Sequence, residues 1–178
     1  MSSYVYKDNL QSERLHTRFL DESYIEKWIP FIGDADSVKF FPWLTQDNLS
    51  EKSTYWISRQ LIRYKECRYG MQAIYSKETN EFLGQCGLLL QEVDGEKELE
   101  VGYHFFKEHR GKGYAPEAAK IFIDFVFKNN LAESVISLID INNNGSIRVA
   151  EKNGLHREKQ TIWNEMNVFV YRINKSTN

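Results

Sequence analysis

The chain has 178 residues and a net charge of −2, and 42% of its residues are hydrophobic, which is enough for one packed core. Its 23 basic and 25 acidic residues are well mixed, so we expect no nucleic-acid partner. We expect a single domain over residues 1–178, because no repeat or Pro/Gly-rich linker divides the chain.

We expect neither a membrane-spanning helix nor an export signal. Its longest apolar stretches, such as 121–127 with the interrupting Asp124, fall short of the roughly 20 residues of a membrane helix. The N-terminal segment MSSYVYKDNLQSER has no apolar signal core. With only Cys67 and Cys86 no disulfide framework is expected, and we predict a cytoplasmic protein without a membrane partner.

The first half of the chain predicts a strand, two helices and an antiparallel meander. In the first helix Tyr24, Trp28 and Phe31 share one side. The runs KETNE and DGEK are typical of turns between strands. In chain order the elements are a strand over 14–20, helices over 21–31 and 49–67, and strands over 71–75, 82–91 and 96–106.

The clearest helix is predicted over 116–129. Ala118, Ala119 and Phe122 belong to an apolar stripe with charged residues opposite, and Pro116 fits the first helical position. The remaining elements are predicted as a strand over 134–141, a short helix over 146–152, and closing strands over 155–163 and 167–173.

The segment RGKGYAPEAA joins a predicted strand to this helix. Gly111 and Gly113 allow the backbone to approach a ligand, and the free N–H groups of a helix N-terminus favour an anion. Arg110 and Lys112 add positive charge suited to a diphosphate. A strand-to-helix turn with surface charges is the alternative interpretation of so short a motif.

Two other nucleotide-binding loops do not fit these residues. A P-loop needs Ser or Thr after its Gly-Lys pair, but Gly113 follows Lys112. A dinucleotide fingerprint needs a third small residue where Pro116 stands, and it should follow an early parallel strand. What remains is a diphosphate-bearing cofactor held by one loop after an antiparallel sheet, and coenzyme A fits that description.

Three motifs of the chain resemble those of the GNAT acetyltransferases. The family's cofactor signature (Q/R)xxGx(G/A) is matched in register by residues 110–115. The resemblance extends from about residue 14 to residue 171, with Leu155 where the family usually has Phe. The branch that acetylates the N-termini of ribosomal proteins is the most similar, through EVGY at 100–103, GKGYAPEA at 111–118 and NNGSIRVAEKNGL at 143–155.

The resemblance implies the α/β (α+β) GNAT fold and a binding mode for acetyl-CoA. The sheet would be mixed, mostly antiparallel and of about seven strands, splayed between the fourth and fifth strands and flanked by helices. The pantetheine arm would enter the gap and pair with backbone near Phe105, and Asn143 would hydrogen-bond the arm or its surroundings. The diphosphate would be held by the amides of Arg110, Gly111, Lys112, Gly113, Tyr114 and Ala115.

The resemblance also implies roles in catalysis, because amine attack on a thioester needs a base and a proton for the thiolate. Glu100 is the expected base, with a solvated or ion-paired glutamate as the alternative. His104 shares its strand face and is the reserve base. Many members of the family protonate the thiolate with a tyrosine, but 147–162 contains none, so Ser146 is expected to protonate it here. A helix-capping hydroxyl is the alternative role of Ser146.

The implied activity is transfer of an acetyl group from acetyl-CoA to a primary amine. The expected acceptor is a protein N-terminal α-amine of the ribosomal-protein-alanine type, or a small amine. A polyamine or aminoglycoside acceptor and a non-catalytic coenzyme A binding module are the alternatives. Histidines and cysteines lack metal-ligand spacing, so no metal is expected. Monomer and homodimer both stay open.

Overall fold

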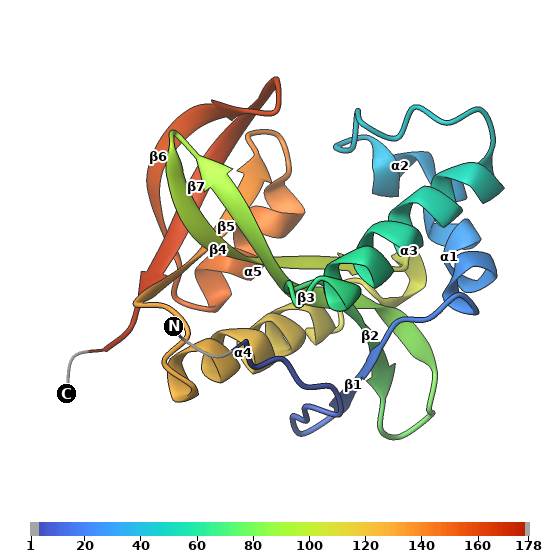
Figure 1. Ribbon diagram of the computed structural model, residues 1–178, viewed down its shortest axis with the longest axis horizontal. Helices are drawn as coiled ribbons and strands as arrows, with labels where there is room; N and C mark the ends of the chain where they lie inside the picture. Colours follow the sequence, from blue (N-terminus) through green and yellow to red (C-terminus); the bar gives the residue numbers. More distant parts are fainter. Residues whose placement is uncertain (1–3, 177–178) are drawn as a thin grey trace.

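The computed structural model describes residues 4–176, which form one seven-stranded sheet with helices on both faces (Figure 1). The strand order is β1-β2-β3-β4-β5-β7-β6. The strands are β1 (Leu15–Phe19), β2 (Met71–Ser76), β3 (Phe82–Val93), β4 (Glu96–Phe105), β5 (Ser134–Asp140), β6 (His156–Trp163) and β7 (Met166–Asn174). The helices are α1 (Tyr24–Gly33), α2 (Ala35–Val38), α3 (Leu49–Lys65), the 3-10 helix η1 (Lys107–His109), α4 (Tyr114–Lys128) and α5 (Asn144–Lys152).

The predicted strands and longer helices are confirmed, and two short helices were not expected. α2 forms because the side chain of Asp34 accepts a hydrogen bond from the Ser37 N–H, which caps a single turn. η1 lies between β4 and the glycine-containing loop. α2 also contacts this loop, because the Arg110 guanidinium hydrogen-bonds the Ser37 hydroxyl. Both short helices thus adjoin the segment in which the sequence predicts an anion site.

Two apolar cores lie on opposite faces of the β1–β4 half of the sheet. Alternate residues of a strand face opposite sides. Met71 and Ala73 of β2 accordingly pack with Trp28 in the core beneath α1 and α3. Ile74 packs with Phe122 in the core against α4. Figure 1 shows the same division, with α1 and α3 on one side of these strands and α4 on the other.

The sheet is divided at the junction of β4 and β5, as predicted. β3 and β4 pair along their length, from Gly84–Phe105 to Val93–Glu96. β4 and β5 form the one parallel strand pairing among residues 4–176. Glu100 and Ile136 are the one residue pair in register between them. Beyond that pair the two strands separate, and β5 continues the sheet by pairing with β7.

Three predicted helix starts were wrong: α1 begins at Tyr24, three residues after the predicted start at 21, and α4 and α5 each begin two residues before theirs. The predicted helix 116–129 is α4, which begins at Tyr114, so Pro116 occupies its third position and not its first. The first N–H groups of a helix have no partner within it, so proline costs no hydrogen bond there. The predicted helix 146–152 is α5, which begins at Asn144 because Asn143 caps it by accepting from the Ser146 N–H. Ser146 is therefore a helical residue and not the cap.

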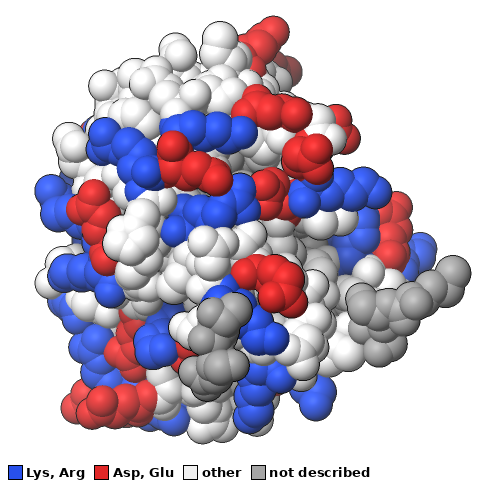
Figure 2. Space-filling model, turned by 90° about the vertical axis from the view of Figure 1, so that its left-hand side faces the viewer, with Lys and Arg blue, Asp and Glu red and all other residues white. Residues whose placement is uncertain are grey.

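The surface agrees with the mixed charge pattern of the sequence. Figure 2 shows basic and acidic side chains interspersed on one face, without a large region of one sign. Among residues 4–176, no helix is both long and apolar enough to cross a membrane.

Gly84 is required by the close approach of β3 to β4. A Cβ atom at this position would lie 2.3 Å from the carbonyl oxygen of His104 and 2.7 Å from the Cα of Phe105. We expect Gly84→Ala to lower the free energy of unfolding by about 3 kcal/mol, because backbone must move to relieve the overlap. Gly95→Ala is the control. Gly95 also has a positive φ, but a Cβ atom there would meet no atom within 4 Å, so the free energy of unfolding should fall by only about 1 kcal/mol. Equal losses in urea denaturation would contradict the overlap argument.

Candidate active site

β4 carries the two candidate bases, Glu100 and His104, on one face of the sheet. Glu100, Gly102 and His104 face α1 and α3, whereas Tyr103 and Phe105 face α4 and α5. The prediction that Glu100 and His104 share a strand face is therefore confirmed.

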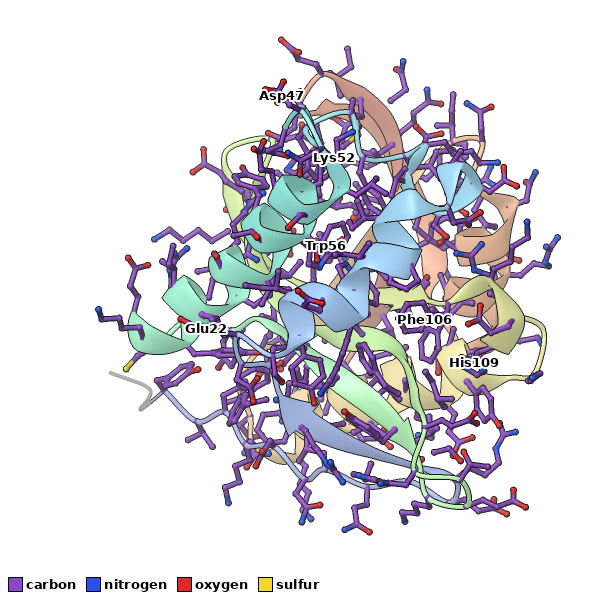
Figure 3. The ribbon with its side chains drawn as sticks, turned by 90° about the vertical axis from the view of Figure 1, so that its right-hand side faces the viewer. Glu22, Asp47, Lys52, Trp56, Phe106 and His109 are labelled. Atoms are coloured by element: carbon purple, nitrogen blue, oxygen red, sulfur yellow. The ribbon has the colours of Figure 1, made fainter. Side chains whose placement is uncertain are left out.

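The larger of two cavities lies over this face, and we call it the α3 cavity. Its volume is about 530 Å³, and it is bounded by α3, the segment 40–45, β4, β5 and the β6–β7 turn. Trp56, in the middle of α3, lies where that helix runs beside α1 (Figure 3). Polar residues on the cavity wall include Arg59, Arg63, Glu100, His104 and Ser146.

Glu100 is buried at the point where β4 and β5 separate. Its Oε1 accepts a hydrogen bond from the Leu138 N–H at 3.2 Å, and its Oε2 accepts one from Gln91 Nε2 at 2.7 Å. Burial raises the pKa of the Glu100 carboxyl to about 7, although these hydrogen bonds and the charge of Arg63 act in the opposite direction. A carboxyl group with this pKa can accept a proton near neutral pH.

His104 sits among aromatic rings instead of polar partners. The ring centroids of Trp56, Phe41 and Phe31 lie 5.0, 5.1 and 6.1 Å from that of the imidazole. Burial, assisted by the positive charge of Arg110, lowers the pKa of His104 to about 3. The imidazole is neutral at pH 7 and is a weaker proton acceptor than Glu100.

The second cavity lies at the N-terminus of α4, and we call it the loop cavity. Its volume is about 380 Å³. Gly111 and Gly113 have φ angles of 75° and 80°, so the loop needs glycine at both positions before α4 begins. The predicted residues that line it are Phe105, Arg110, Gly111, Gly113, Tyr114, Ala115, Asn143 and Ser146. Of the loop residues described, Lys112 alone is outside this lining, and its contact with a cofactor stays a prediction.

Arg110 makes contacts within the protein that its motif position did not predict. Its Nε donates to the carbonyl oxygen of Phe105 at 2.9 Å, and its guanidinium also hydrogen-bonds the Ser37 hydroxyl. Asp34, whose nearest carboxylate oxygen is 4.0 Å away, lies on the same side. Arg110 therefore joins α2, the end of β4 and the loop.

Arg14 holds the other side of the loop, and no motif pointed to it. Its guanidinium donates to the carbonyl oxygen of Lys112 at 3.0 Å and pairs with Glu117 at 2.7 Å. It also lies 4.7 Å from the centroid of the Tyr114 ring. The segment before β1 thus fixes both the loop and the first turn of α4.

The start of α5 adjoins both cavities. Asn143 Oδ1 accepts from the Ser146 N–H at 3.1 Å, and the Tyr103 hydroxyl donates to the Ser146 carbonyl oxygen at 2.8 Å. The Ser146 hydroxyl itself has no hydrogen-bond partner within the described residues 4–176. Burial raises the pKa of Tyr103, so its phenol stays protonated. Tyr103 was not among the predicted site residues, because its role depends on a contact with α5 that lies 43 residues away.

The two cavities meet beside the separation of β4 and β5. The residues that line both are Phe40, Phe41, Tyr103, His104, Asn143 and Ser146. The loop cavity also contains Arg148 and Lys152 of α5, two positive charges that the motif comparison did not single out. A ligand with an anionic end on the loop can therefore extend toward Glu100 in the α3 cavity.

Comparisons with known proteins agree with this geometry. A family model described as an acetyltransferase (GNAT) domain matches residues 14–156. The uncharacterized protein YkkB of Bacillus subtilis strain 168 is 34% identical over 164 residues, which cover 89% of this chain and 92% of that protein. The acetyltransferase from Agrobacterium tumefaciens strain C58 has a TM-score of 0.79 at 26% identity, over 96% of both chains.

A more distant solved structure, with coenzyme A bound, shares the fold. It is the ribosomal L7/L12 α-N-protein acetyltransferase RimL, with a TM-score of 0.72 at 15% identity, over 94% of this chain and 98% of that one. The family model spans most of the present chain and includes the loop, Glu100 and Ser146. The chain belongs to the GNAT acetyltransferase family and is an acetyl-CoA-dependent acyltransferase.

Proposed function

We propose that the protein transfers the acetyl group of acetyl-CoA to a protein N-terminal α-amine. The observation that carries this proposal is Glu100, a buried carboxyl with a pKa of about 7 in a cavity that opens into the loop cavity. An α-amine has an ordinary pKa of about 8, so a base of this strength suits it better than a lysine amine at about 10.4.

The loop cavity is the proposed site for the coenzyme A part of the substrate. The first N–H groups of α4 have no partner within the helix and can bind an anion, and the positive end of the helix dipole favours the diphosphate. Arg148 and Lys152 add charge for the phosphate groups. Phe105 and Asn143 line the same cavity as the loop and Ser146, and the pantetheine is proposed to lie against them.

The proposed chemistry is a direct transfer. The amine nitrogen bonds to the thioester carbonyl carbon and the C–S bond breaks. Glu100 takes the proton that the amine loses, and the Ser146 hydroxyl gives its proton to the thiolate and regains one from water. The hydroxyl of Ser146 is suited to this because Asn143 and Tyr103 hold its backbone while its side chain keeps its hydrogen-bonding capacity.

Small amines are the second class of acceptor that fits the α3 cavity, and the fold is compatible with both. RimL is named as an acetyltransferase of a ribosomal protein α-amine, but the likeness to it is in fold alone. A coenzyme A binding module without catalysis is less consistent with Glu100, because a raised pKa in a buried cavity is typical of functional carboxyl groups.

The decisive experiment combines binding and turnover in one preparation. Acetyl-CoA is titrated by calorimetry, and thiol release is then followed with peptides of different N-terminal residues, polyamines and aminoglycosides. We expect acetyl-CoA to bind and the peptides to be acetylated at the α-amine. Binding without turnover on any amine would leave a coenzyme A module, and turnover on polyamines alone would replace the proposed acceptor.

Gly113→Glu is expected to abolish acetyl-CoA binding. The side chain would add bulk and negative charge at the N-terminus of α4, where the diphosphate is proposed to bind. Gly95→Glu is the matched control, since Gly95 also has a positive φ but lies in the β3–β4 turn outside the loop cavity. Calorimetry should detect binding to the control and none to Gly113→Glu. Equal affinity in the two variants would refute the loop assignment.

The rate is expected to fall with decreasing pH because Glu100 must be ionised to accept a proton. Below its pKa of about 7 the carboxyl is protonated, so kcat should drop about tenfold per pH unit there. Glu100→Gln should lower kcat at pH 8 by about 100-fold and remove this acid limb of the pH–rate profile. Two acceptors with different amine pKa values separate the causes: a limb that moves with the acceptor would assign it to the amine and not to Glu100.

Ser146→Ala is expected to lower kcat by about tenfold or more while the affinity for acetyl-CoA changes little. Asn143 and not Ser146 caps α5, so the free energy of unfolding should stay within about 0.5 kcal/mol of the wild-type value. Thiol release, calorimetry and urea denaturation measure the three quantities. A variant with normal turnover would give Ser146 a purely structural role.

A further inference from the structure

One wall of the α3 cavity carries two arginines. Trp56, Arg59, Gln60 and Arg63 all line this cavity, and their spacing along α3 puts them on one face of the helix. Arg59 and Arg63 are one turn apart, so their side chains are neighbours on the cavity wall.

Neither arginine has an ion-pair partner in the part of the chain that the structure describes. Within residues 4–176, no carboxylate oxygen lies within 4.0 Å of either guanidinium, whereas Arg14, Arg68 and Arg172 each have such a partner. Arg63 donates to Gln60 Oε1 at 3.0 Å. The Arg59 guanidinium lies over the rings of Trp43 and Tyr55, at 5.3 and 5.5 Å from their centroids.

The arrangement is costly for Arg63 in the absence of an anion. Burial lowers its pKa to about 10, the charges of Arg59 and Arg68 act in the same direction, and Glu100 partly offsets them. The guanidinium is still protonated at neutral pH, so the cavity holds a partly desolvated positive charge. A bound anion would compensate that charge with strong, charge-assisted hydrogen bonds.

The other charged groups of the cavity leave this wall positive. Glu100 is engaged by the Leu138 N–H and by Gln91, and it lies on the sheet, not on α3. Asp140 and Glu165 also line the cavity, at the end of β5 and in the β6–β7 turn. His104 is neutral. The cavity thus has a cationic wall on α3 and carboxyl groups elsewhere.

We propose that the acceptor carries an anionic group, a carboxylate or a phosphate, besides its amine, and that Arg63 and Arg59 bind this group while the amine faces Glu100. The inference rests on the proposed function and names the class of its substrate. Acceptors without an anionic group, such as polyamines and aminoglycosides, are disfavoured because they leave the two arginines uncompensated.

The first test compares acceptors that differ only in the anion. Thiol release is measured with a peptide whose second residue is Asp or Asn, with alanine or alaninamide, and with phosphoethanolamine or ethanolamine. We expect wild-type kcat/KM to favour the anionic member of at least one pair by about tenfold. The peptide pair and the small-molecule pairs distinguish the two sources of the anion.

Three variants assign this preference to α3. Arg63→Gln should reduce it to about threefold or less without changing the affinity for acetyl-CoA, and Arg63→Lys should retain part of it. Arg68→Gln is the matched control, since Arg68 pairs with Glu66 outside the cavity, and it should behave as wild type. Equal rates within every pair for the wild-type enzyme, or an unchanged preference in the Arg59→Gln/Arg63→Gln double variant, would overturn the proposal.

A second measurement tests anion binding by Arg59 and Arg63 without relying on turnover. Inorganic phosphate and glutarate are titrated by calorimetry in the presence of saturating coenzyme A, so that the loop cavity is occupied. Binding to the wild-type protein and to Arg68→Gln, but not to the double variant, is expected. If no amine is acetylated, the proposed function fails, whereas loss or persistence of anion binding in the double variant still decides the role of the arginines.

Discussion

The parallel contact between β4 and β5 is the constraint on which both cavities depend. Antiparallel pairing holds β1 to β4 together, and it holds β5 to β7 and β6, but a single pair in register joins the two halves. Strands that separate expose backbone N–H and C=O groups, which need other partners. Glu100 supplies one by accepting from Leu138, and Arg110 supplies another by donating to Phe105.

At this separation the proposed catalytic role of Glu100 is in conflict with stability. The carboxyl of Glu100 has its raised pKa because it is buried, and burial of a charge is unfavourable. The molecule offsets that cost with the two apolar cores on the faces of the sheet, and the aromatic residues around His104 belong to this packing. The site residues are carried by β4 and by the starts of α4 and α5, and side chains outside the site maintain their geometry.

Sequence reasoning predicted the elements whose signals are local. The spacing of apolar residues located the strands and longer helices, and the glycines at 111 and 113 located the loop, since both need a positive φ. It missed Arg14 and Tyr103, whose contacts with the loop and with α5 join segments far apart in the chain. The starts of α4 and α5 were placed too late, because Gly113 and Asn143 allow each helix to begin before the residue that seemed to open it.

Glu100 and Arg63 do not form a direct ion pair, and this keeps the pKa of the Glu100 carboxyl high. A guanidinium in direct contact would lower the pKa of the carboxyl by about 1–3 units and remove its ability to accept a proton at neutral pH. Arg63 instead hydrogen-bonds Gln60, and its charge opposes the raised pKa of Glu100 only in part. An anion on Arg63 would weaken that opposition and raise the pKa of Glu100 further. Binding of an acceptor with an anionic group would then strengthen the proposed base, while a larger share of the Glu100 carboxyl would be protonated at neutral pH.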